Sequence, residues 1–370
     1  MVCLLGARQV GKTTLARSIA SRGPAANFYD LEDSDQLARL ADPLLELRRR
    51  SGLIVLDEVQ RRPELFPALR VLADERPRRR RFLLLGSASP ALLKQSSESL
   101  AGRIAYLEVG GLNLAEMPRA RWERVWLRGG FPHSLLAPDD FASFDWRRRF
   151  RQTFVERDLP ALELPNTPPG ATLSRYWAML AHVHGELLNW SELGRSMGVS
   201  DFSARRYADL LHGTLMVRLL QPWHENISKR QVKAPKLFFR DSGLLHVQLG
   251  IETIDALLQH PKAGASWEGF IIEQLLTLAR VEPEECFFWR TEHGAELDLL
   301  IVRRGQKIGI EVKRTGAPSL TPSMRNALED LKLDALYVVH AGEHGFSLGP
   351  SVEAVPWKRL GALATRLGRR

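Results

Sequence analysis

The chain has 370 residues, 44% of them hydrophobic, which is enough for two to four domains with apolar cores of their own. No apolar run approaches the roughly 18 residues that a membrane-spanning helix needs, and Met1 leads directly into MVCLLG without the basic segment of a secretory leader. Cys3 and Cys286 are too few for a disulfide framework or a cysteine-based zinc site. We therefore expect a cytoplasmic protein of several domains with no membrane partner.

The formal charge is +9, and arginines cluster at residues 48–50, 78–81 and 147–149. An excess of Lys and Arg is typical of proteins that bind nucleic acid, because these cations neutralise phosphates and release counterions. Runs of arginine also occur on ordinary solvated surfaces. Charge alone therefore leaves DNA binding and a plain basic surface equally open.

A phosphate-binding loop is predicted near the N-terminus, where residues 2–16 read VCLLGARQVGKTTLA. An apolar strand leads into the pattern G-x-x-x-x-G-K-T from Gly6 to Thr13, and a helix follows. Such a loop wraps backbone N–H groups around a phosphate at a helix N-terminus, with Lys12 reaching the β- and γ-phosphates of ATP and the Thr13 hydroxyl binding Mg²⁺. The residues predicted to contact the nucleotide are Gly6, Ala7, Arg8, Gln9, Val10, Gly11, Lys12, Thr13 and Thr14.

Two further strands are predicted to end in polar side chains beside this loop. GLIVLDEVQ carries a continuous apolar run, as a strand buried on both faces does, and ends in Asp57 and Glu58. In a P-loop NTPase the Asp supports the Mg²⁺ shell and the following Glu polarises the attacking water, so the pair predicts hydrolysis of the nucleotide. RFLLLGSAS then offers Ser87 as a strand-end hydroxyl near the γ-phosphate, and a hydroxyl that only closes a turn is the alternative.

This order of motifs resembles AAA-type ATPases. In that class a polar residue on the strand after the Asp-Glu strand senses the γ-phosphate, which the resemblance assigns to Ser87. A later arginine acts on the nucleotide of a neighbouring subunit, and the resemblance places it at Arg103, which implies a homo-oligomer. A surface arginine that caps a helix after Gly102 is an equal alternative.

The middle of the chain is predicted to be helical. WLRGGFPHSLLA and WRRRFRQTFVERDLPALEL have helical periodicity and lead into a proline-rich linker, ELPNTPPGATL. Their GGFP and Glu156-Arg157-Asp158 segments suggest no chemistry, so we expect structural roles for them. His182 and His184 stand two residues apart, on opposite faces of a helix, and are expected to be ordinary polar or partly buried histidines rather than metal ligands.

After the linker the pattern is typical of a winged helix-turn-helix. NWSELGRSMG and SDFSARRYADLLHG are short amphipathic helices joined at Gly198, with Asn189 or Ser191 as the first cap. TLMVRLLQPW and KLFFRDSGLL follow as the strands of a wing. Arg205 and Arg206 on the second helix are the candidates for contact with a DNA groove, and a module that only packs or binds protein is an equal alternative.

Two adjacent strands in the C-terminal third carry acidic residues on a shared face. Glu296 and Asp298 on AELDLLIV point the same way, as do Glu311 and Lys313 on KIGIEVKR, because alternate side chains of a strand share a face. A hairpin would bring Asp298, Glu311 and Lys313 together. Two carboxylates and a lysine suit metal-dependent cleavage of a phosphodiester, and a solvated hairpin with a cross-strand ion pair is the alternative.

The helix GASWEGFIIEQLLTLARV followed by these strands resembles the PD-(D/E)XK nuclease fold. That fold has an acidic residue on its first helix, an Asp on one strand and Glu-x-Lys on the next, and the resemblance assigns the helix position to Glu268, with Glu273 as the second choice. No Pro precedes Asp298, so the first half of the motif is not matched. The resemblance implies Mg²⁺ or Mn²⁺ held by Glu268, Asp298 and Glu311, with Lys313 as a catalytic residue.

Taken whole, the chain resembles a widespread prokaryotic family of AAA-type ATPases whose C-terminal region is known only as a domain of unknown function. The segments that carry this resemblance are GARQVGKTTL, LIVLDEVQ, LLLGSAS, SESLAGR, LRGGFP, ERDL, APKLFFRDSGLL and GAELDLLI…IGIEVK. We expect an α/β fold with an AAA-type P-loop NTPase core built on a parallel sheet at residues 1–112, a helical lid at 113–168, a winged helix-turn-helix at 169–247 and a restriction-endonuclease-like α/β domain at 248–370.

The sequence supports three hypotheses about function. The first is an ATP-hydrolysing, DNA-associated protein of genome maintenance or defence, in which the nucleotide state controls a winged helix and a nuclease-like domain that cuts DNA through Asp298, Glu311 and Lys313. The second is an ATP-dependent switch or scaffold that binds a protein partner and has an inactive nuclease-like domain. The third is a transcriptional regulator that binds DNA through Arg205 and Arg206.

Overall fold

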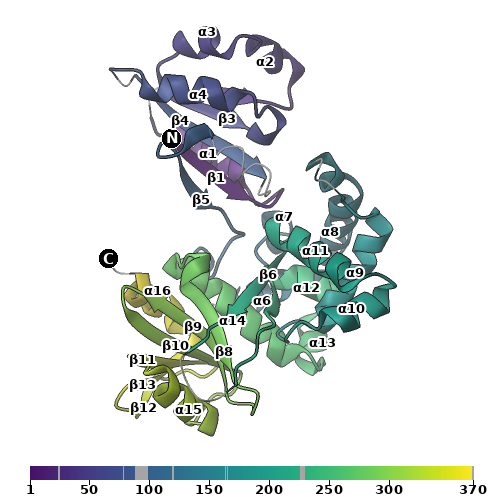
Figure 1. The fold of residues 1–370 in the computed structure, drawn as a ribbon, viewed down its shortest axis with the longest axis vertical. Coiled ribbons are helices and arrows are strands. Elements are labelled where there is room, and N and C mark those ends of the chain that lie inside the picture. The colour runs from purple at the N-terminus through teal and green to yellow at the C-terminus, as the bar shows by residue number, and fades with distance from the viewer. Residues whose placement is uncertain are drawn as a thin grey trace.

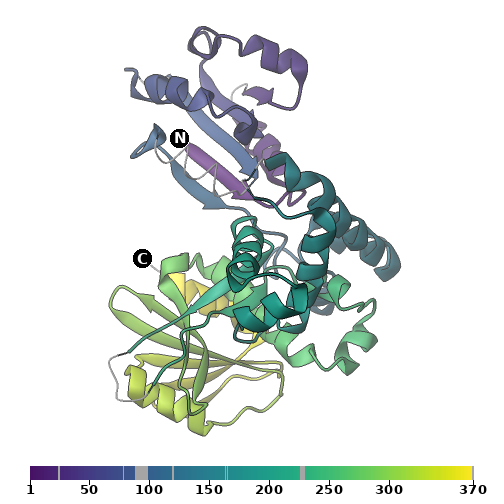
Figure 2. The same cartoon turned by 45° about the vertical axis from the view of Figure 1, so that its right-hand side comes forward.

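The structure, a computed structural model, describes residues 1–23, 26–77, 79–87, 99–118, 121–162, 164, 166–225 and 230–368. The N-terminal α/β part stands at one end, and the middle and C-terminal parts pack together in a second body (Figure 1, Figure 2). Parts of the LLLGSAS and SESLAGR segments lie outside the described residues, as do Arg78 of the basic run and Glu163 and Pro165 of the predicted linker. Within the described ranges, no helix is both long and apolar enough to cross a membrane.

A five-stranded parallel sheet forms the N-terminal part. Its strands, in spatial order, are β2 (Asn27–Asp30), β3 (Gly52–Asp57), β4 (Arg80–Ser87), β1 (Val2–Gly6) and β5 (Ala105–Glu108). The described helices between them are α1 (Lys12–Ala20), α2 (Ser34–Arg39), α3 (Pro43–Arg48) and α4 (Leu65–Asp74). Because the strands are parallel, the carboxyl ends of β1, β3 and β4 meet at one edge, and this edge carries the predicted P-loop.

Both faces of this sheet are covered, as its unbroken apolar strands predict. Ile54 and Leu56 of β3 point to the face where Phe66 of α4 packs, whereas Val55 points to the other face, where Ala16 of α1 packs. These five side chains are at most 1% exposed. The α/β prediction with a parallel sheet is confirmed for this part of the chain.

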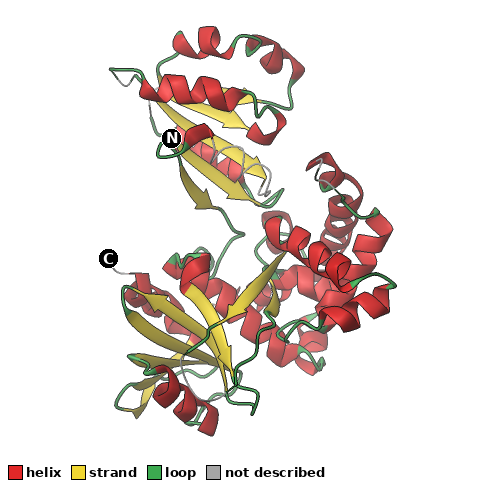
Figure 3. Ribbon diagram, viewed as in Figure 1, coloured by secondary structure: helices red, strands yellow, loops and turns green. Residues whose placement is uncertain are grey.

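Helices make up most of the middle of the chain (Figure 3). In chain order they are α6 (Trp122–Arg128), α7 (Pro132–Leu135), α8 (Asp140–Thr153), the π-helical turn η3 (Phe154–Asp158), α9 (Gly170–His182), α10 (Trp190–Met197), α11 (Asp201–Gly213), α12 (Ser242–Gln248) and α13 (Ile254–Gln259). Asn189 caps α10 by accepting a hydrogen bond from the Glu192 N–H at 3.2 Å, and Ser200 caps α11 through the Ser203 N–H at 3.2 Å. The two helices predicted on either side of Gly198 are therefore present, and Asn189 rather than Ser191 is the cap.

An eight-stranded sheet runs from the middle of the chain into its C-terminal part, in the order β12-β13-β11-β10-β9-β8-β6-β7. Its strands are β6 (Val217–Pro222), β7 (Lys236–Phe239), β8 (Cys286–Arg290), β9 (Glu296–Arg303), β10 (Gln306–Lys313), β11 (Ala335–His340), β12 (Phe346–Gly349) and β13 (Val352–Pro356). β6 pairs antiparallel with β7 and parallel with β8, where Gln221 lies opposite Phe287. The segments expected as a separate winged helix and a separate nuclease-like domain thus share one sheet, because a strand of the expected wing reaches β8.

The helix expected to belong to a lid, α6, packs on the C-terminal part instead. Its Trp122 and Trp126 rings lie 5.5 and 5.3 Å from the ring of Trp267, on α14 (Ala263–Ala279), and Trp122 lies 4.8 Å from Trp357. α14 and α16 (Leu360–Gly368) bury the same apolar cluster against one face of the sheet, and α15 (Pro322–Leu331) covers the other face. The sequence shows the apolar stripe of residues 122–128, but its partner lies far along the chain.

The GGFP segment (residues 129–132) packs closely against the RDSG segment (residues 240–243). This contact is the structural role of both segments. Gly129 has a φ of +74° and lies so close to Asp241 that a Cβ there would be 2.1 Å from Oδ1. Asp241 Oδ2 accepts a hydrogen bond from the Gly130 N–H at 2.7 Å. A Cβ on Gly243 would likewise lie 2.1 Å from the carbonyl oxygen of Arg128. The two glycine-containing segments therefore approach each other more closely than any larger residue allows.

Most of the arginines in the predicted basic clusters have partners within the chain. Arg147 is fully buried and donates to three backbone carbonyl oxygens at 2.9, 3.1 and 3.2 Å, and burial lowers its pKa to about 10. Arg148 and Arg149 both pair with Asp145, at 2.7 and 2.8 Å. Arg80 donates to Glu75 and to three backbone carbonyls. Several arginines of these clusters thus form ion pairs or hydrogen bonds within the chain.

A buried carboxylate, Glu273 of α14, holds two arginines of the second body. It accepts hydrogen bonds from Arg218 of β6, through Nε and through Nη2 at 2.9 Å, and Arg240 Nε lies 3.5 Å from its Oε2. Arg240 also donates from Nη1 to Glu108, at the end of β5, at 3.1 Å. Burial opposes the charged form of Glu273, but the two arginines outweigh it and lower its pKa.

We expect Glu273→Gln to lower the free energy of unfolding of the second body by about 3 to 5 kcal/mol, because it leaves the buried Arg218 without its counter-ion. Urea unfolding followed by near-ultraviolet circular dichroism measures this change. The control is Glu353→Gln, which removes the partner of Arg366 from an exposed pair and should change the free energy by less than about 1 kcal/mol. Equal effects of the two substitutions would contradict the role assigned to Glu273.

Candidate functional site

The predicted phosphate-binding loop connects β1 to α1. Gly11 has a φ of +102°, a conformation that L side chains rarely adopt, and α1 begins at the next residue. Lys12 is 5% exposed, and its Nζ donates to the carbonyl oxygens of Gly6 at 3.0 Å and Ala7 at 2.8 Å. Burial lowers the pKa of Lys12, and Glu58 and Asp57 oppose this shift. The loop therefore presents an ammonium group and a helix N-terminus to the same space, which suits a polyphosphate.

Thr13 and Asp57 meet at the start of α1. Thr13 Oγ1 donates to Asp57 Oδ2 at 2.7 Å, and Asp57 Oδ1 accepts from the Glu58 N–H at 3.0 Å. Burial raises the pKa of Asp57, and the hydrogen bond from Thr13 opposes the rise. A hydroxyl and a carboxylate oxygen this close to each other beside a phosphate-binding loop fit Mg²⁺, which usually takes one or two protein oxygens and completes its shell with phosphate and water.

Glu58, Gln60 and Ser87 form a chain of polar contacts along this edge. Glu58 accepts a hydrogen bond from Gln60 Nε2, and Gln60 Oε1 accepts one from the Ser87 N–H at 3.3 Å. Ser87 lies opposite Gly6 in the register of β4 and β1, and its buried Oγ has no hydrogen-bond partner among the described residues. Gln60 was missed by the sequence analysis, and its place in LDEVQ, three residues after Asp57, was the only signal.

Arg8 reaches out of the loop to the middle of the chain. Its Nη1 donates to Asp158 Oδ1 at 2.6 Å, and its Nη2 donates to Glu32 Oε1 at 3.1 Å. Asp158 lies on η3 and is 6% exposed. The Glu156-Arg157-Asp158 segment, to which the sequence gave no chemistry, thus holds the phosphate-binding loop through its last residue. No local pattern could indicate this pair, because its members are 150 positions apart.

Arg103 lies away from the phosphate-binding edge of its own domain. It precedes β5, whose first residue pairs with Val2 at the beginning of β1, so it stands at the amino ends of the strands. Its guanidinium donates to both oxygens of Asp74, at 2.7 and 2.8 Å. Arg103 therefore has an ion pair within the chain, at the end of α4.

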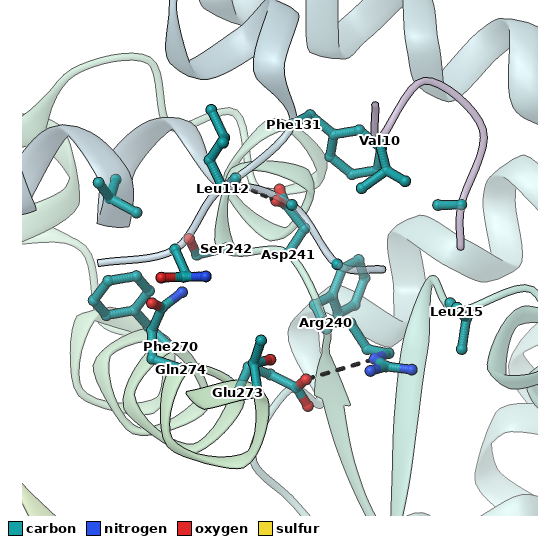
Figure 4. Close-up of a pocket in the computed structure, with 18 of the residues that line it drawn as sticks. Val10, Leu112, Phe131, Leu215, Arg240, Asp241, Ser242, Phe270, Glu273 and Gln274 are labelled. Atoms are coloured by element: carbon teal, nitrogen blue, oxygen red, sulfur yellow. Dashed lines mark hydrogen bonds and ion pairs between the residues drawn. The ribbon is translucent and has the colours of Figure 1, made fainter. Parts of the chain in front are cut away.

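A cavity of about 80 Å³ lies where the P-loop, the segment 108–113, β7 and α14 meet (Figure 4). Val10 and Phe131 line one wall, and Glu273 and Arg240 face each other across an ion pair on another. Three of its charged groups contact one another, because Arg240 binds both Glu273 and Glu108. Since these three side chains already have partners, we interpret the cavity as part of the joint between the two bodies.

The acidic residues predicted on the hairpin do come together. Asp298 of β9 and Glu311 of β10 stand next to Leu299 and Ile310, which lie opposite each other in the register of the two strands. The two acids are 7% and 4% exposed. Asp298 Oδ2 accepts from the Val312 N–H at 2.8 Å, and Lys313 Nζ donates to Glu311 Oε1 at 2.6 Å. The alternation of the two strands therefore places these side chains on one face, as the sequence indicates.

A residue that the sequence analysis missed, Lys236 of β7, lies among these acids. Its side chain is 3% exposed, and its Nζ pairs with Glu296 and lies 3.4 Å from Glu268 Oε1. Burial opposes its charge, but Glu268, Asp298 and Glu296 outweigh this effect and raise its pKa. Burial and the charge of Asp298 raise the pKa of Glu268 to about 8, and the same two causes raise that of Glu311 to about 7. The cluster therefore has more acidic groups than its lysines neutralise.

The predicted metal ligands Glu268, Asp298 and Glu311 do not fit a divalent ion in this arrangement. In the part of the chain that the structure describes, no three His, Cys, Asp or Glu side chains are grouped so that they could hold a metal ion. The ammonium of Lys236 pairs with Glu268, the helix residue of the predicted set. Glu273, the second choice for the helix position, is bound to Arg218 and lies in the joint instead.

Only one of the two arginines predicted to enter a DNA groove is exposed. Arg205 is exposed on α11, whereas Arg206 is half-buried, with its guanidinium carbon 5.8 Å from the centre of the Tyr207 ring. Of the two histidines, His184 is 1% exposed, and its ring accepts a hydrogen bond from the Phe239 N–H at 3.0 Å. Burial lowers the pKa of His184 to about 3, so it is a structural residue.

Comparison with known proteins identifies the family. Residues 1–118 match the family described as AAA domain, residues 119–255 match Domain of unknown function (DUF8612), and residues 263–360 match Domain of unknown function (DUF4143). The chain is 49% identical over 356 residues to "Uncharacterized protein Rv2008c" of Mycobacterium tuberculosis and to "Uncharacterized protein Mb2031c" of Mycobacterium bovis, covering 96% of this chain and 80% of each relative. The chain belongs to their family. Its AAA domain makes the N-terminal part an ATP-binding P-loop ATPase domain.

Two solved structures are more distant. A Thermotoga maritima RuvB Holliday junction branch migration motor is 19% identical, with 59% of this chain and 81% of that chain covered and a TM-score of 0.28. Protein VC1899 from Vibrio cholerae is 14% identical, with 100% of this chain and 97% of that chain covered and a TM-score of 0.21. Neither score is high enough to bear on fold or function.

We expect Arg8 and Asp158 to stabilise the structure jointly, because each loses a charged partner when the other is removed. A double-mutant cycle of Arg8→Ala and Asp158→Asn, measured by urea unfolding, should give a coupling free energy of about 1.5 to 3 kcal/mol. The exposed pair Arg148 and Asp145 is the control and should give less than about 1 kcal/mol. A coupling below that of the control would show that the P-loop is not held by Asp158.

Proposed function

We propose that the chain binds ATP with Mg²⁺ at the P-loop and hydrolyses it. The observation that carries this proposal is the 2.7 Å contact between Thr13 and Asp57, at a helix N-terminus that Lys12 shares. Lys12 binds the β- and γ-phosphates, and the backbone N–H groups of residues 6–14 wrap around them. Thr13 and Asp57 hold Mg²⁺, which when bound neutralises charge on the phosphates.

In this proposal Glu58 orients and polarises the attacking water, and Gln60 keeps Glu58 in place. Gln60 donates to Glu58 and accepts from the Ser87 N–H, so one side chain links the residue facing the water to the strand that ends beside the loop. The buried Ser87 hydroxyl, which has no hydrogen-bond partner among the described residues, contacts the γ-phosphate. The arrangement therefore distinguishes ATP from ADP through the position of Ser87.

We expect Glu58→Gln to bind ATP with about the affinity of the parent and to hydrolyse it about 10² to 10⁴ times more slowly, as is typical when a group that assists proton transfer is lost. Binding is measured with a fluorescent ATP analogue, and hydrolysis is measured as phosphate release. Lys12→Ala should lose binding, and Glu64→Gln, which alters an exposed carboxylate, should match the parent. Full hydrolysis by Glu58→Gln would overturn the assigned role.

In the homo-oligomer that the AAA resemblance implies, Arg103 acts on the nucleotide of a neighbouring subunit. This arginine can act on a neighbour's nucleotide only after it has left Asp74. Its position at the amino ends of the strands, away from the P-loop of its own subunit, is what supports a role between subunits. Asp74→Asn is therefore expected to leave hydrolysis intact, and Arg103→Ala is expected to lower it only at protein concentrations where the oligomer forms.

For the second body we propose binding of DNA under the control of the ATPase. The helices α10 and α11, the antiparallel strands β6 and β7 and the exposed Arg205 support a winged helix. The net charge of +9 supports contact with phosphates. Cleavage of DNA by Asp298, Glu311 and Lys313 is not part of the proposal for this arrangement, because Lys236 lies among the acids.

We expect DNA binding that weakens with salt, and we expect Arg205→Ala to reduce the slope of log affinity against log salt by about 1, because it removes one positive charge from the helix predicted to face the groove. Electrophoretic mobility shifts at several salt concentrations measure the slope. Arg148→Ala, which alters an arginine already paired with Asp145, is the control and should leave the slope unchanged. Absence of any salt-dependent binding by the parent would favour the ATP-dependent switch with a protein partner.

A further inference from the structure

Lys236 occupies the centre of the acidic cluster of the C-terminal part. Its ammonium group pairs with Glu296 of β9 and lies 3.4 Å from Glu268 of α14, and its side chain is 3% exposed. The Phe238 and Phe288 rings have their centres 6.0 and 5.7 Å from its Nζ. Lys236 is thus a desolvated cation between carboxylates from two different elements, with aromatic rings around it.

Such a cation performs the electrostatic task that a divalent ion performs in a cluster of this kind. Four carboxylates gather here, on Glu268, Glu296, Asp298 and Glu311, and hard oxygens in this number attract Mg²⁺ or Mn²⁺ strongly. An ammonium is compact, carries a full charge and offers three N–H donors to the same oxygens. Because Lys236 already pairs with Glu268, a divalent ion that binds this carboxylate competes with the ammonium for the same oxygens.

We propose that Lys236 is the resident cation of this cluster and that it excludes divalent metal from Glu268, Asp298 and Glu311. The proposal goes beyond the ATPase function and depends on neither nucleotide hydrolysis nor DNA binding. It is consistent with the finding that no three His, Cys, Asp or Glu side chains of the described residues are grouped so that they could hold a metal ion. It also assigns a role to Lys236, whose strand belongs to the expected wing.

The position of Lys236 is set by the strand that carries it. β7 pairs with β6 through Leu220 and Lys236, and Lys236 also forms an isolated bridge with Leu187. Alternate residues of a strand share a face, so Arg240, just beyond β7, follows Lys236 along one side. Lys236 binds Glu268, and Arg240 binds Glu273, both on α14. β7 and α14 are therefore joined by two ion pairs along one side of the strand.

The simpler alternative is that Lys236 only stabilises the fold. In that case its removal leaves uncompensated buried carboxylates, which destabilises the protein, and creates no site for a metal ion. The two interpretations differ in one measurable quantity, which is the affinity of the nucleotide-free chain for a divalent cation after the ammonium has been removed.

We expect Lys236→Met to bind Mn²⁺ at least about tenfold more tightly than the parent, because the freed carboxylate oxygens are hard ligands. Mn²⁺ binding is measured on the full chain without nucleotide by electron paramagnetic resonance and calorimetry. The gain should disappear in Lys236→Met combined with Glu268→Gln, and it should persist when Asp57→Asn removes the carboxylate of the P-loop. The matched control is Lys358→Met, which removes a lysine from an exposed pair with Glu343.

Three results would overturn the proposal. They are Mn²⁺ binding by Lys236→Met no tighter than that of the parent, a gain that Glu268→Gln leaves intact, and a gain that Asp57→Asn abolishes. If Lys236→Met does not fold, Lys236→Gln removes the charge while keeping polar N–H groups and is tested in the same way. Tight Mn²⁺ binding by the parent that Glu268→Gln removes would also overturn it, because the resident ammonium would then not exclude the metal.

Discussion

The buried carboxylate of Glu273 is the interaction on which the arrangement of the second body depends. It holds Arg218 of β6 and Arg240 beyond β7, and Arg240 also holds Glu108 at the end of β5. Glu273 thus connects the strands of the expected wing to the helix α14, and Arg240 extends this network to Glu108 of the AAA domain. A buried ion pair adds little net stability, but loss of one partner is strongly destabilising. The same contact therefore fixes β6 and β7 against α14.

The nucleotide site is the part of the molecule that sequence predicts best. Its strand, loop and helix are contiguous, so Gly6, Lys12 and Thr13 are placed by local backbone geometry. Asp57 follows because its strand is buried on both faces and parallel strands end at one edge. Asp158 could not be predicted, although it binds Arg8 at 2.6 Å. Its contact depends on how the π-helical turn η3 packs against the AAA domain, and no sequence period encodes that packing.

The acidic cluster shows the same division between local and distant information. The two-residue period of strands predicts that Asp298, Glu311 and Lys313 share a face, and the structure has them there. The surplus of acids over lysines on that face is itself a signal, because a buried carboxylate requires a counter-ion or a proton. The surplus of acids predicts a cation from elsewhere in the chain. It does not identify which of the 52 lysines and arginines supplies that cation. Only the shared sheet brings Lys236 from β7.

The strand β7 and the helix α14 are fastened to each other at two points. Lys236 meets Glu268, and Arg240 meets Glu273. Both cations lie along one side of the strand, and both acids lie on one helix, so a shift of β7 disturbs both ion pairs together. Arg240 also binds Glu108 of the AAA domain, so the four residues of β7 lie between the contact with that domain and the acidic cluster.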